Sequence, residues 1–457
     1  MRRTMSLWAM LVLFVALRAT PGDAHEATLQ VDPWVRSLVS AGLAASSAKR
    51  EALGGGLAHY TWRVRVGQGR YDAVTVHRVV RESYPWVPAR TRRAVFMVHG
   101  DLWGFVPAFL THTRVTTTPE SRSLAAFLAS EDVDVWGLDL RWVNVPQAET
   151  DFAFMADWTL GTHVQDVGTG LALADGVRRL SGNGGKDRMF LLGWSRGATI
   201  GYAYLDAESQ RPRGQRRVDG FVPVDMVLRF APDAVDQRQW ACDRYVALQT
   251  ARDEGRTEGG LLGPAPGMPV RELGRLADEA PNDPSSMPVK LAGGAPPTNR
   301  QAAIIAAGDT GALLDPLKPL TPGYHLAGSV TDIAGRPTRT AFTPEPTLFD
   351  YFQQAAPYQS LNEVVETEAQ LCGLDVPYDD HLKDVKVPVL YVGAAGGVGS
   401  YGEYSTRLLG STDVTRLIVR SRPEAQRALD VGHADLFLAR DARVRVWRPI
   451  LQWMEAR

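Results

Sequence analysis

Residues 187–208 read DRMFLLGWSRGATIGYAYLDAE, in which an apolar run of strand length leads into Gly193-Trp194-Ser195-Arg196-Gly197. An apolar stretch compatible with a helix follows. This order predicts a strand, a tight turn that carries Ser195, and a helix. The glycines two residues before and after the serine allow the turn to close, because a side chain at either place would collide with the neighbouring strand or helix. A serine exposed on a strained turn at a helix N-terminus is suited to act as a nucleophile.

Two further apolar runs are predicted to be buried strands of the same sheet. Residues 94–100 read AVFMVHG, and residues 132–139 read DVDVWGLD. With the serine turn, they make the chain resemble the α/β-hydrolase family over most of residues 57–225 and 385–457. The resemblance implies an α/β fold, in which helices flank a mostly parallel sheet.

The resemblance also places an oxyanion hole. In this family, the loop after the strand that ends in His-Gly supplies one backbone N–H, and the residue after the nucleophile supplies the other. By position, the two donors are the backbone N–H groups of Asp101 and Arg196. Their side chains are not expected to matter for that role. His99 is expected to order the oxyanion loop rather than to take part in the chemistry.

A serine hydroxyl needs a base within hydrogen-bond reach to become a good nucleophile. His433 lies in the stretch DVGHADLF, residues 430–437, after the last predicted strand, Val414–Val419, and before an amphipathic terminal helix. In the family the base lies on this loop, so the resemblance implies that His433 is the base. The alternative is a surface histidine that caps the helix.

The triad acid is where the sequence departs from the commoner family pattern. The predicted strand at residues 387–392 is followed by GAAGGV, which holds no carboxylate. Some family members place the acid at the end of the preceding strand, which here ends at Asp225. Asp225 is therefore the first choice, since a carboxylate there can orient the imidazole. Glu403 is the second choice, although its place at the start of a predicted helix also suits a first-turn carboxylate.

The chain of 457 residues is longer than one hydrolase core requires. The surplus is predicted to be a cap or lid subdomain at residues 226–385, inserted between the two parts of the core, 25–225 and 386–457. Residues 236–252, 269–279, 297–307 and 347–370 of the insertion are predicted to be helical. Residues 25–56 are predicted as a helical lead-in, and residues 60–66 and 71–80 as an antiparallel hairpin.

Residues 1–24 have the pattern of a signal peptide. Two arginines precede an apolar run from Leu7 to Leu17, and small residues occupy positions 22 and 24. The run is shorter than the roughly 20 residues that span a bilayer, so we expect cleavage after Ala24 rather than an integral membrane anchor. The protein is thus predicted to be a secreted or periplasmic protein of a bacterium. In an exported protein the two cysteines, Cys242 and Cys372, can form one disulfide, with two free thiols as the alternative.

Composition limits the partners. The formal net charge is −1 with both signs interspersed, which argues against a nucleic-acid partner. No phosphate-binding or metal-binding motif is present, so no cofactor and no metal are expected. Asp379-Asp380-His381 is interpreted as a solvated loop. The sequence gives no indication of the oligomeric state.

The predicted activity is that of a serine hydrolase acting on an ester, with a small-molecule or lipid ester as substrate. Two other functions remain open. One is an amidase or peptidase with the same triad, and the other is an inactive scaffold that binds a ligand or partner through its cap. Four tryptophans are candidates for the wall of an acyl pocket: Trp103, Trp142, Trp158 and Trp194.

Overall fold

The computed structural model describes residues 48–110, 123–181, 183, 189–286, 296–311, 319–332 and 335–457. All of them belong to one compact unit, Ala44–Arg457. The predicted signal peptide lies outside the described residues. In the part of the chain that the structure describes, no helix is long and apolar enough to cross a membrane.

A mixed sheet forms the centre of the described unit, in the order β1-β2-β3-β6-β5-β7-β8-β11-β12, with β4 paired to β3. The strands from β6 to β12 in this order are parallel, and β1, β2 and β3 join them in antiparallel pairs. A separate two-stranded sheet pairs β9 with β10. The strands are β1 Lys49–Gly54, β2 Leu57–Arg65, β3 Ala73–Tyr84, β4 Val87–Pro88, β5 Arg93–Val98, β6 Val133–Asp139, β7 Met189–Trp194, β8 Val218–Val224, β9 Ser329–Thr331, β10 Pro337–Thr340, β11 Val389–Ala394 and β12 Val414–Val419.

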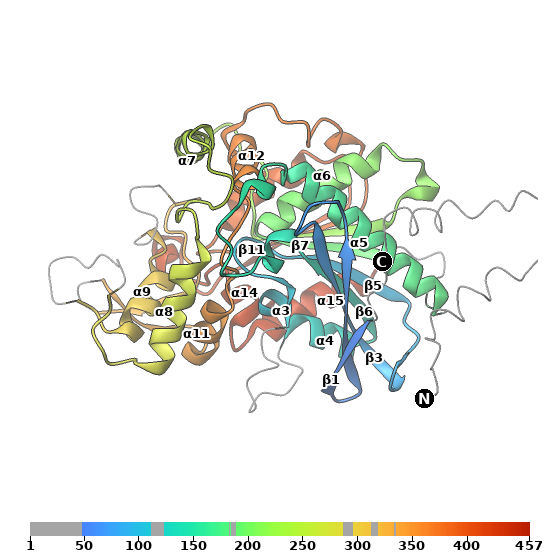
Figure 1. Ribbon diagram of the computed structural model, residues 1–457, viewed down its shortest axis with the longest axis horizontal. Coiled ribbons are helices and arrows are strands. Elements are labelled where there is room, and N and C mark those ends of the chain that lie inside the picture. The colour runs from blue at the N-terminus through green and yellow to red at the C-terminus, as the bar shows by residue number, and fades with distance from the viewer. Residues whose placement is uncertain are drawn as a thin grey trace, which may run out of the picture. The chain divides into compact units, whose positions relative to one another are not determined.

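Helices cover both faces of the sheet (Figure 1). They are α3 Phe105–Phe109, α4 Leu124–Ser130, α5 Leu160–Leu180, α6 Arg196–Ser209, α7 Val235–Asp253, α8 Gly267–Glu279, α9 Asn299–Gly308, α11 Glu345–Gln353, α12 Leu361–Cys372, α13 Glu403–Arg407, α14 Asp435–Leu438 and α15 Arg448–Glu455. A short 3-10 turn, η3, spans Arg141–Asn144. The predicted mostly parallel sheet flanked by helices is thus confirmed.

Side chains alternate between the two faces of the sheet, and both faces are covered by helices. Side chains of successive strand residues point to opposite faces, so the buried strands β7 and β11, and β5 after Arg93, must be apolar on both sides. On one face, Phe190 of β7 contacts Trp453 of α15, with ring centroids 5.5 Å apart. On the other, Phe221 of β8 contacts Tyr202 of α6 at 4.9 Å. The helix that follows Ser195 is therefore anchored on the sheet.

Two local predictions need correction. The last part of the predicted helical lead-in, Lys49–Gly54, is strand β1, which pairs with β2 across a glycine turn. Backbone pairing with a neighbouring strand outweighed its weak helical pattern. The predicted helix at residues 347–370 is two helices, α11 and α12. Pro357 lies between them, and a proline cannot donate the backbone hydrogen bond that a continuous helix needs.

The segment between β8 and β11, residues 225–388, contains α7, α8, α9, α11 and α12, so its predicted helical content is confirmed. Its first and last α-helices, α7 and α12, pack against each other. A disulfide joins Cys242 of α7 to Cys372 at the end of α12. We call this part of the chain the β8–β11 segment.

Candidate active site

Ser195 lies on the turn between β7 and α6 with a left-handed backbone, φ 57°. Such a φ is strained for any residue other than glycine. Added Cβ atoms show why the two glycines are required. A Cβ on Gly193 would lie 2.3 Å from the carbonyl oxygen of Gly197, and one on Gly197 would lie 2.1 Å from that of Val98. Both are closer than any real contact, so only glycine lets β7, β5 and α6 meet around the serine.

The side chains of Asp225 and His433 meet although they are 208 residues apart in the chain. The Nδ1 atom of His433 lies 2.7 Å from Oδ2 of Asp225, and the carboxylate is fully buried. The His433 ring also stacks on Trp194, with centroids 5.2 Å apart and an interplanar angle of 24°. The imidazole is therefore fixed by a hydrogen bond at one nitrogen and by a ring contact beside the serine turn.

The glycine-rich loop after β11 carries no carboxylate of its own because it encloses the carboxylate of Asp225. Its backbone N–H groups bind the carboxylate of Asp225: Ala394 donates to Oδ1 at 2.7 Å, and Val398 and Gly399 donate at 3.1 and 3.2 Å. A Cβ on Gly397 would lie 2.0 Å from Oδ2 of Asp225. The loop thus wraps around an acid supplied by the neighbouring strand, and three donors compensate the burial of its charge.

Glu403, the second candidate acid, lies elsewhere. It begins α13, and its carboxylate oxygen is 3.9 Å from Nε of Arg416. It lines a separate surface hollow with Tyr404 and Arg407. A carboxylate in the first turn favourably opposes the helix dipole, which is the other role that the sequence suggested for it.

A cavity of about 180 Å³ opens at the serine turn. Ser195 and His433 both line it, together with Asp101 and Arg196. The β8–β11 segment supplies much of its wall, which is mostly apolar. The contributing side chains of that segment are Met226, Arg244, Leu261, Leu262, Pro266, Val270, Thr310, Leu320, Tyr324, Leu326, Tyr351, Gln359, Val364 and Glu368.

The two residues expected to supply the oxyanion hole lie at this cavity. Arg196 is the first residue of α6, and the first N–H groups of a helix have no partner within the helix. Asp101 lies on the loop after β5. His99 is buried and holds this loop, because its Nδ1 lies 2.9 Å from the Gly100 carbonyl oxygen and its Nε2 accepts from the N–H of Leu140 at 3.0 Å.

The side chains of Asp101 and Arg196, which were not expected to matter for the oxyanion role, form a two-point ion pair. Nη2 of Arg196 donates to Oδ2 of Asp101 at 2.8 Å, and Nε donates to Oδ1. Desolvation tends to raise the pKa of Asp101, but the Arg196 guanidinium outweighs it, and the pKa lies below its usual range. Sequence reasoning missed this pair because the two residues are 95 positions apart.

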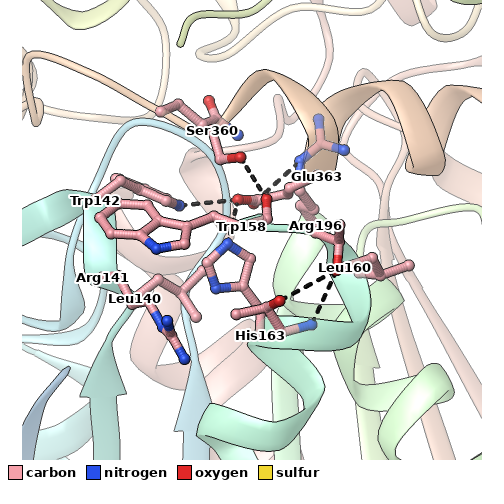
Figure 2. A network of polar contacts seen from close by, with 12 residues as sticks. Leu140, Arg141, Trp142, Trp158, Leu160, His163, Arg196, Ser360 and Glu363 are labelled. Carbon is pink, nitrogen blue, oxygen red and sulfur yellow. Dashed lines mark hydrogen bonds and ion pairs between the residues drawn. The ribbon is translucent and has the colours of Figure 1, made fainter. Parts of the chain in front are cut away.

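Behind the cavity, Glu363 of α12 is the centre of a buried polar network (Figure 2). One carboxylate oxygen lies 2.8 Å from Nε2 of His163 and accepts from Nε1 of Trp142 at 3.0 Å. The other lies 3.7 Å from Nε of Arg196. Glu363 and His163 are both fully buried. The network therefore joins the β8–β11 segment to α5, to η3 and to the serine turn.

The four tryptophans predicted to form a pocket wall divide into two pairs. Trp103 and Trp194 line the cavity. Trp142 and Trp158 are buried, and each donates to a carboxylate, Trp142 to Glu363 and Trp158 to Asp72 at 3.0 Å. A buried indole N–H usually pairs with an acceptor, and here the N–H groups of Trp142 and Trp158 donate to carboxylates of the polar network. Its partners are too far apart in sequence for any local pattern to indicate them.

The pH dependence of stability should reveal the charge on His163. Burial tends to lower the pKa of this imidazole, but Glu363 and Asp166 raise it to about 9. The folded protein therefore holds the proton more tightly than the unfolded chain does, whose histidine pKa is 6.5. This contribution, about 3 kcal/mol, is full below pH 6.5 and is lost as the pH rises through 9.

Urea unfolding between pH 6 and pH 9.5 measures this effect. Over that interval the free energy of unfolding should fall by about 3 kcal/mol more in the unmodified protein than in His163→Gln. The comparison uses the change with pH, so a constant loss of stability in the variant does not affect it. Equal falls in the two proteins would show that His163 is neutral in the folded state.

Comparison with known proteins supports the fold. No family model and no curated protein matches the chain. Among solved structures, a Sulfolobus solfataricus protein provisionally named a lipase has a TM-score of 0.59 at 16% identity, covering 90% of this chain and 99% of its own. A soluble variant of Saccharomyces cerevisiae monoglyceride lipase has a TM-score of 0.44 at 11% identity, covering 91% and 97%. The chain has the α/β-hydrolase fold.

Proposed function

We propose that this protein is a serine hydrolase that cleaves a carboxylic ester through an acyl-enzyme. The observation that carries the proposal is the contact between Asp225 and His433, 2.7 Å long, at a cavity that Ser195 also lines. Nucleophile, base and orienting acid are recognised by such geometry rather than by sequence position. The strained turn under Ser195 and the fold itself support the same assignment.

The reaction follows from the roles of these groups. Oγ of Ser195 bonds to the ester carbonyl carbon while Nε2 of His433 takes its proton, and Asp225 stabilises the imidazolium that forms. The backbone N–H groups of Asp101 and Arg196 bind the oxyanion, each contributing about 3–4 kcal/mol in comparable sites. The leaving alcohol receives the proton from His433. Water, deprotonated by His433, then cleaves the acyl-enzyme to the carboxylic acid and free Ser195.

The size of the cavity supports a short acyl group. Its volume is about 180 Å³, whereas pockets for drug-sized ligands measure roughly 300–1,000 Å³. We therefore propose that the β8–β11 segment acts as a cap whose apolar residues enclose a short acyl chain. Arg244 and Glu368, ion-paired at 2.9 Å, add one charged pair to this mostly apolar wall.

The experiment that tests the function is turnover of p-nitrophenyl esters with acyl chains of two to twelve carbons, beside a p-nitroanilide of the preferred acyl group. We expect the highest kcat/KM for short esters and far slower anilide cleavage. Comparable cleavage of the anilide would favour the amidase or peptidase alternative. If the folded protein turns over neither class, the alternative of an inactive scaffold that binds through its cap replaces the proposal.

We also propose that the protein is exported and loses residues 1–24. The signal-peptide pattern of the sequence supports this, as does the disulfide between Cys242 and Cys372, because such bonds persist in oxidising compartments. Mass spectrometry of the protein recovered from its native host would test the cleavage site. An N-terminus other than His25 would contradict the predicted site.

A further inference from the structure

The ion pair between Asp101 and Arg196 ties together the two backbone segments that carry the proposed oxyanion donors. Asp101 lies on the loop after β5, and Arg196 begins α6. A guanidinium and a carboxylate joined at two points have a fixed relative geometry, unlike a single flexible contact. Each side chain belongs to the residue whose N–H would bind the oxyanion. The pair therefore limits how far the two N–H groups can move apart.

The β8–β11 segment holds this pair from the opposite side. Nε2 of Gln359 donates to Oδ1 of Asp101 at 2.5 Å, and Glu363 lies 3.7 Å from Nε of Arg196. Both of these side chains are buried. The segment thus contributes a neutral donor to the carboxylate and a negative charge to the guanidinium.

Backbone contacts place the same loop against the segment. The N–H of Ala356 donates to the carbonyl oxygen of Leu102 at 2.5 Å, and Nε1 of Trp103 donates to the carbonyl oxygen of Tyr351 at 2.7 Å. Leu102 itself has a left-handed backbone, φ 66°. A strained conformation persists only where its surroundings over-determine it. The contacts of Ala356 and Tyr351, both in the β8–β11 segment, hold the loop at Leu102 and Trp103.

The buried charge of Arg196 favours the arrangement in which the carboxylates of Asp101 and Glu363 lie close to its guanidinium. The Arg196 side chain is 5% exposed, and a buried guanidinium is unfavourable unless carboxylates face it closely. Asp101 and Glu363 are those carboxylates, and His163 contacts the other oxygen of the Glu363 carboxylate. If the segment moved away, Arg196 would lose the nearby negative charge of Glu363, and Asp101 would lose a hydrogen bond.

We propose that the Asp101–Arg196 pair is a positioning clamp for the oxyanion hole, and that Gln359 and Glu363 make its geometry depend on docking of the β8–β11 segment. The residues of the clamp act through their own backbone N–H groups, not by side-chain contact with the substrate. The inference rests on the proposed function, because it requires a reaction that develops an oxyanion. In the docked arrangement, the segment that encloses the acyl chain also completes the hole.

Asp101→Asn in the full chain tests the clamp. Asparagine has the same shape and keeps the backbone N–H, but it removes the charge that holds Arg196. We expect kcat for a p-nitrophenyl ester to fall about 100-fold with KM within about twofold, the size of effect that misplacement of reacting groups produces. The matched control is Glu272→Gln, which breaks the two-point pair with Arg275 on the surface of α8 and should leave kcat unchanged.

A thionoester separates a positioning effect from a general structural one. In O-(p-nitrophenyl) thionobutyrate, sulfur replaces the carbonyl oxygen, and a sulfur anion gains less from hydrogen-bond donors. The ratio of kcat for the oxygen ester to that for the thionoester should therefore fall at least tenfold in Asp101→Asn. An equal loss for both esters, or kcat within twofold of the unmodified protein, would overturn the clamp.

Glu363→Gln tests the dependence on the β8–β11 segment. This isosteric change removes the counter-charge from Arg196 at a site on α12, and it should lower the same ratio. An unchanged ratio would overturn the coupling to the segment. The proposed function fails separately: if the unmodified protein hydrolyses no ester, or if Ser195→Ala retains the activity, the serine mechanism is wrong irrespective of the clamp.

Discussion

Ser195→Ala should abolish covalent labelling by a fluorophosphonate probe and lower kcat for ester hydrolysis on the order of 10⁶-fold, as loss of the nucleophile does in comparable triads. Labelling requires an oxygen nucleophile that His433 can deprotonate, and alanine offers none. The fold should survive, because alanine keeps the Cβ atom that packs against Gly100. Its cost at the positive φ of this position is similar to that of serine.

A matched control lies at the other end of the same helix. Ser209 is the last residue of α6, and its hydroxyl donates to the carbonyl oxygen of Asp206 at 2.7 Å. Ser209→Ala should retain both labelling and turnover. The measurement is in-gel fluorescence after probe treatment, with circular dichroism to verify folding. Turnover that persists in folded Ser195→Ala would remove the serine turn from the mechanism.

Asp225→Asn should lower kcat about 10⁴-fold, the loss that the equivalent change causes in comparable triads. The surroundings of the carboxylate explain the expected severity. Oδ1 accepts three backbone N–H bonds from Ala394, Val398 and Gly399, so an asparagine must place its own oxygen there. Its NH₂ group would then face Nδ1 of His433 and donate to it. That forces the ring proton onto Nε2, which can no longer accept the proton of Ser195.

The control for the acid is Glu403→Gln, which changes the other carboxylate that the sequence offered for this role. Its kcat should stay within about twofold of the unmodified protein, because Glu403, at the start of α13, faces Arg416 of β12 rather than the imidazole. The two variants are compared by steady-state kinetics on one ester and by urea unfolding. The reverse result, a large loss only in Glu403→Gln, would make Glu403 the acid.

Much of the fold could be predicted because its signals are local. The apolar run, the serine and its glycines stand within residues 187–208. Asp225 could be named as a candidate acid from its position at the end of its strand, and the structure places its carboxylate beside His433. The glycine run after β11, which has no carboxylate of its own, surrounds that of Asp225. In this loop Gly397 leaves room for the carboxylate, and the N–H groups of Ala394, Val398 and Gly399 surround it. A glycine-rich loop that follows a strand next to a candidate acid therefore indicates where that carboxylate can be bound.

The network around Glu363 could not be predicted, for an equally physical reason. Trp142 and Glu363 are 221 positions apart in the chain. The periodicity of an amphipathic helix does not indicate which of its charged residues will be buried. The ion pair between the side chains of Asp101 and Arg196 could not be predicted for the same reason. Local sequence specifies backbone geometry well, but buried charges are paired by tertiary structure.

The disulfide between Cys242 and Cys372 has a topological consequence. The two half-cystines are 130 positions apart, so the chain between them is a closed covalent ring. A protease that cuts once within residues 243–371 would leave two polypeptides still joined, migrating together on a non-reducing gel. Ser195 and Asp225 precede the ring, and His433 follows it. After a single cut within the ring, the disulfide would still join the polypeptide that carries Ser195 and Asp225 to the one that carries His433.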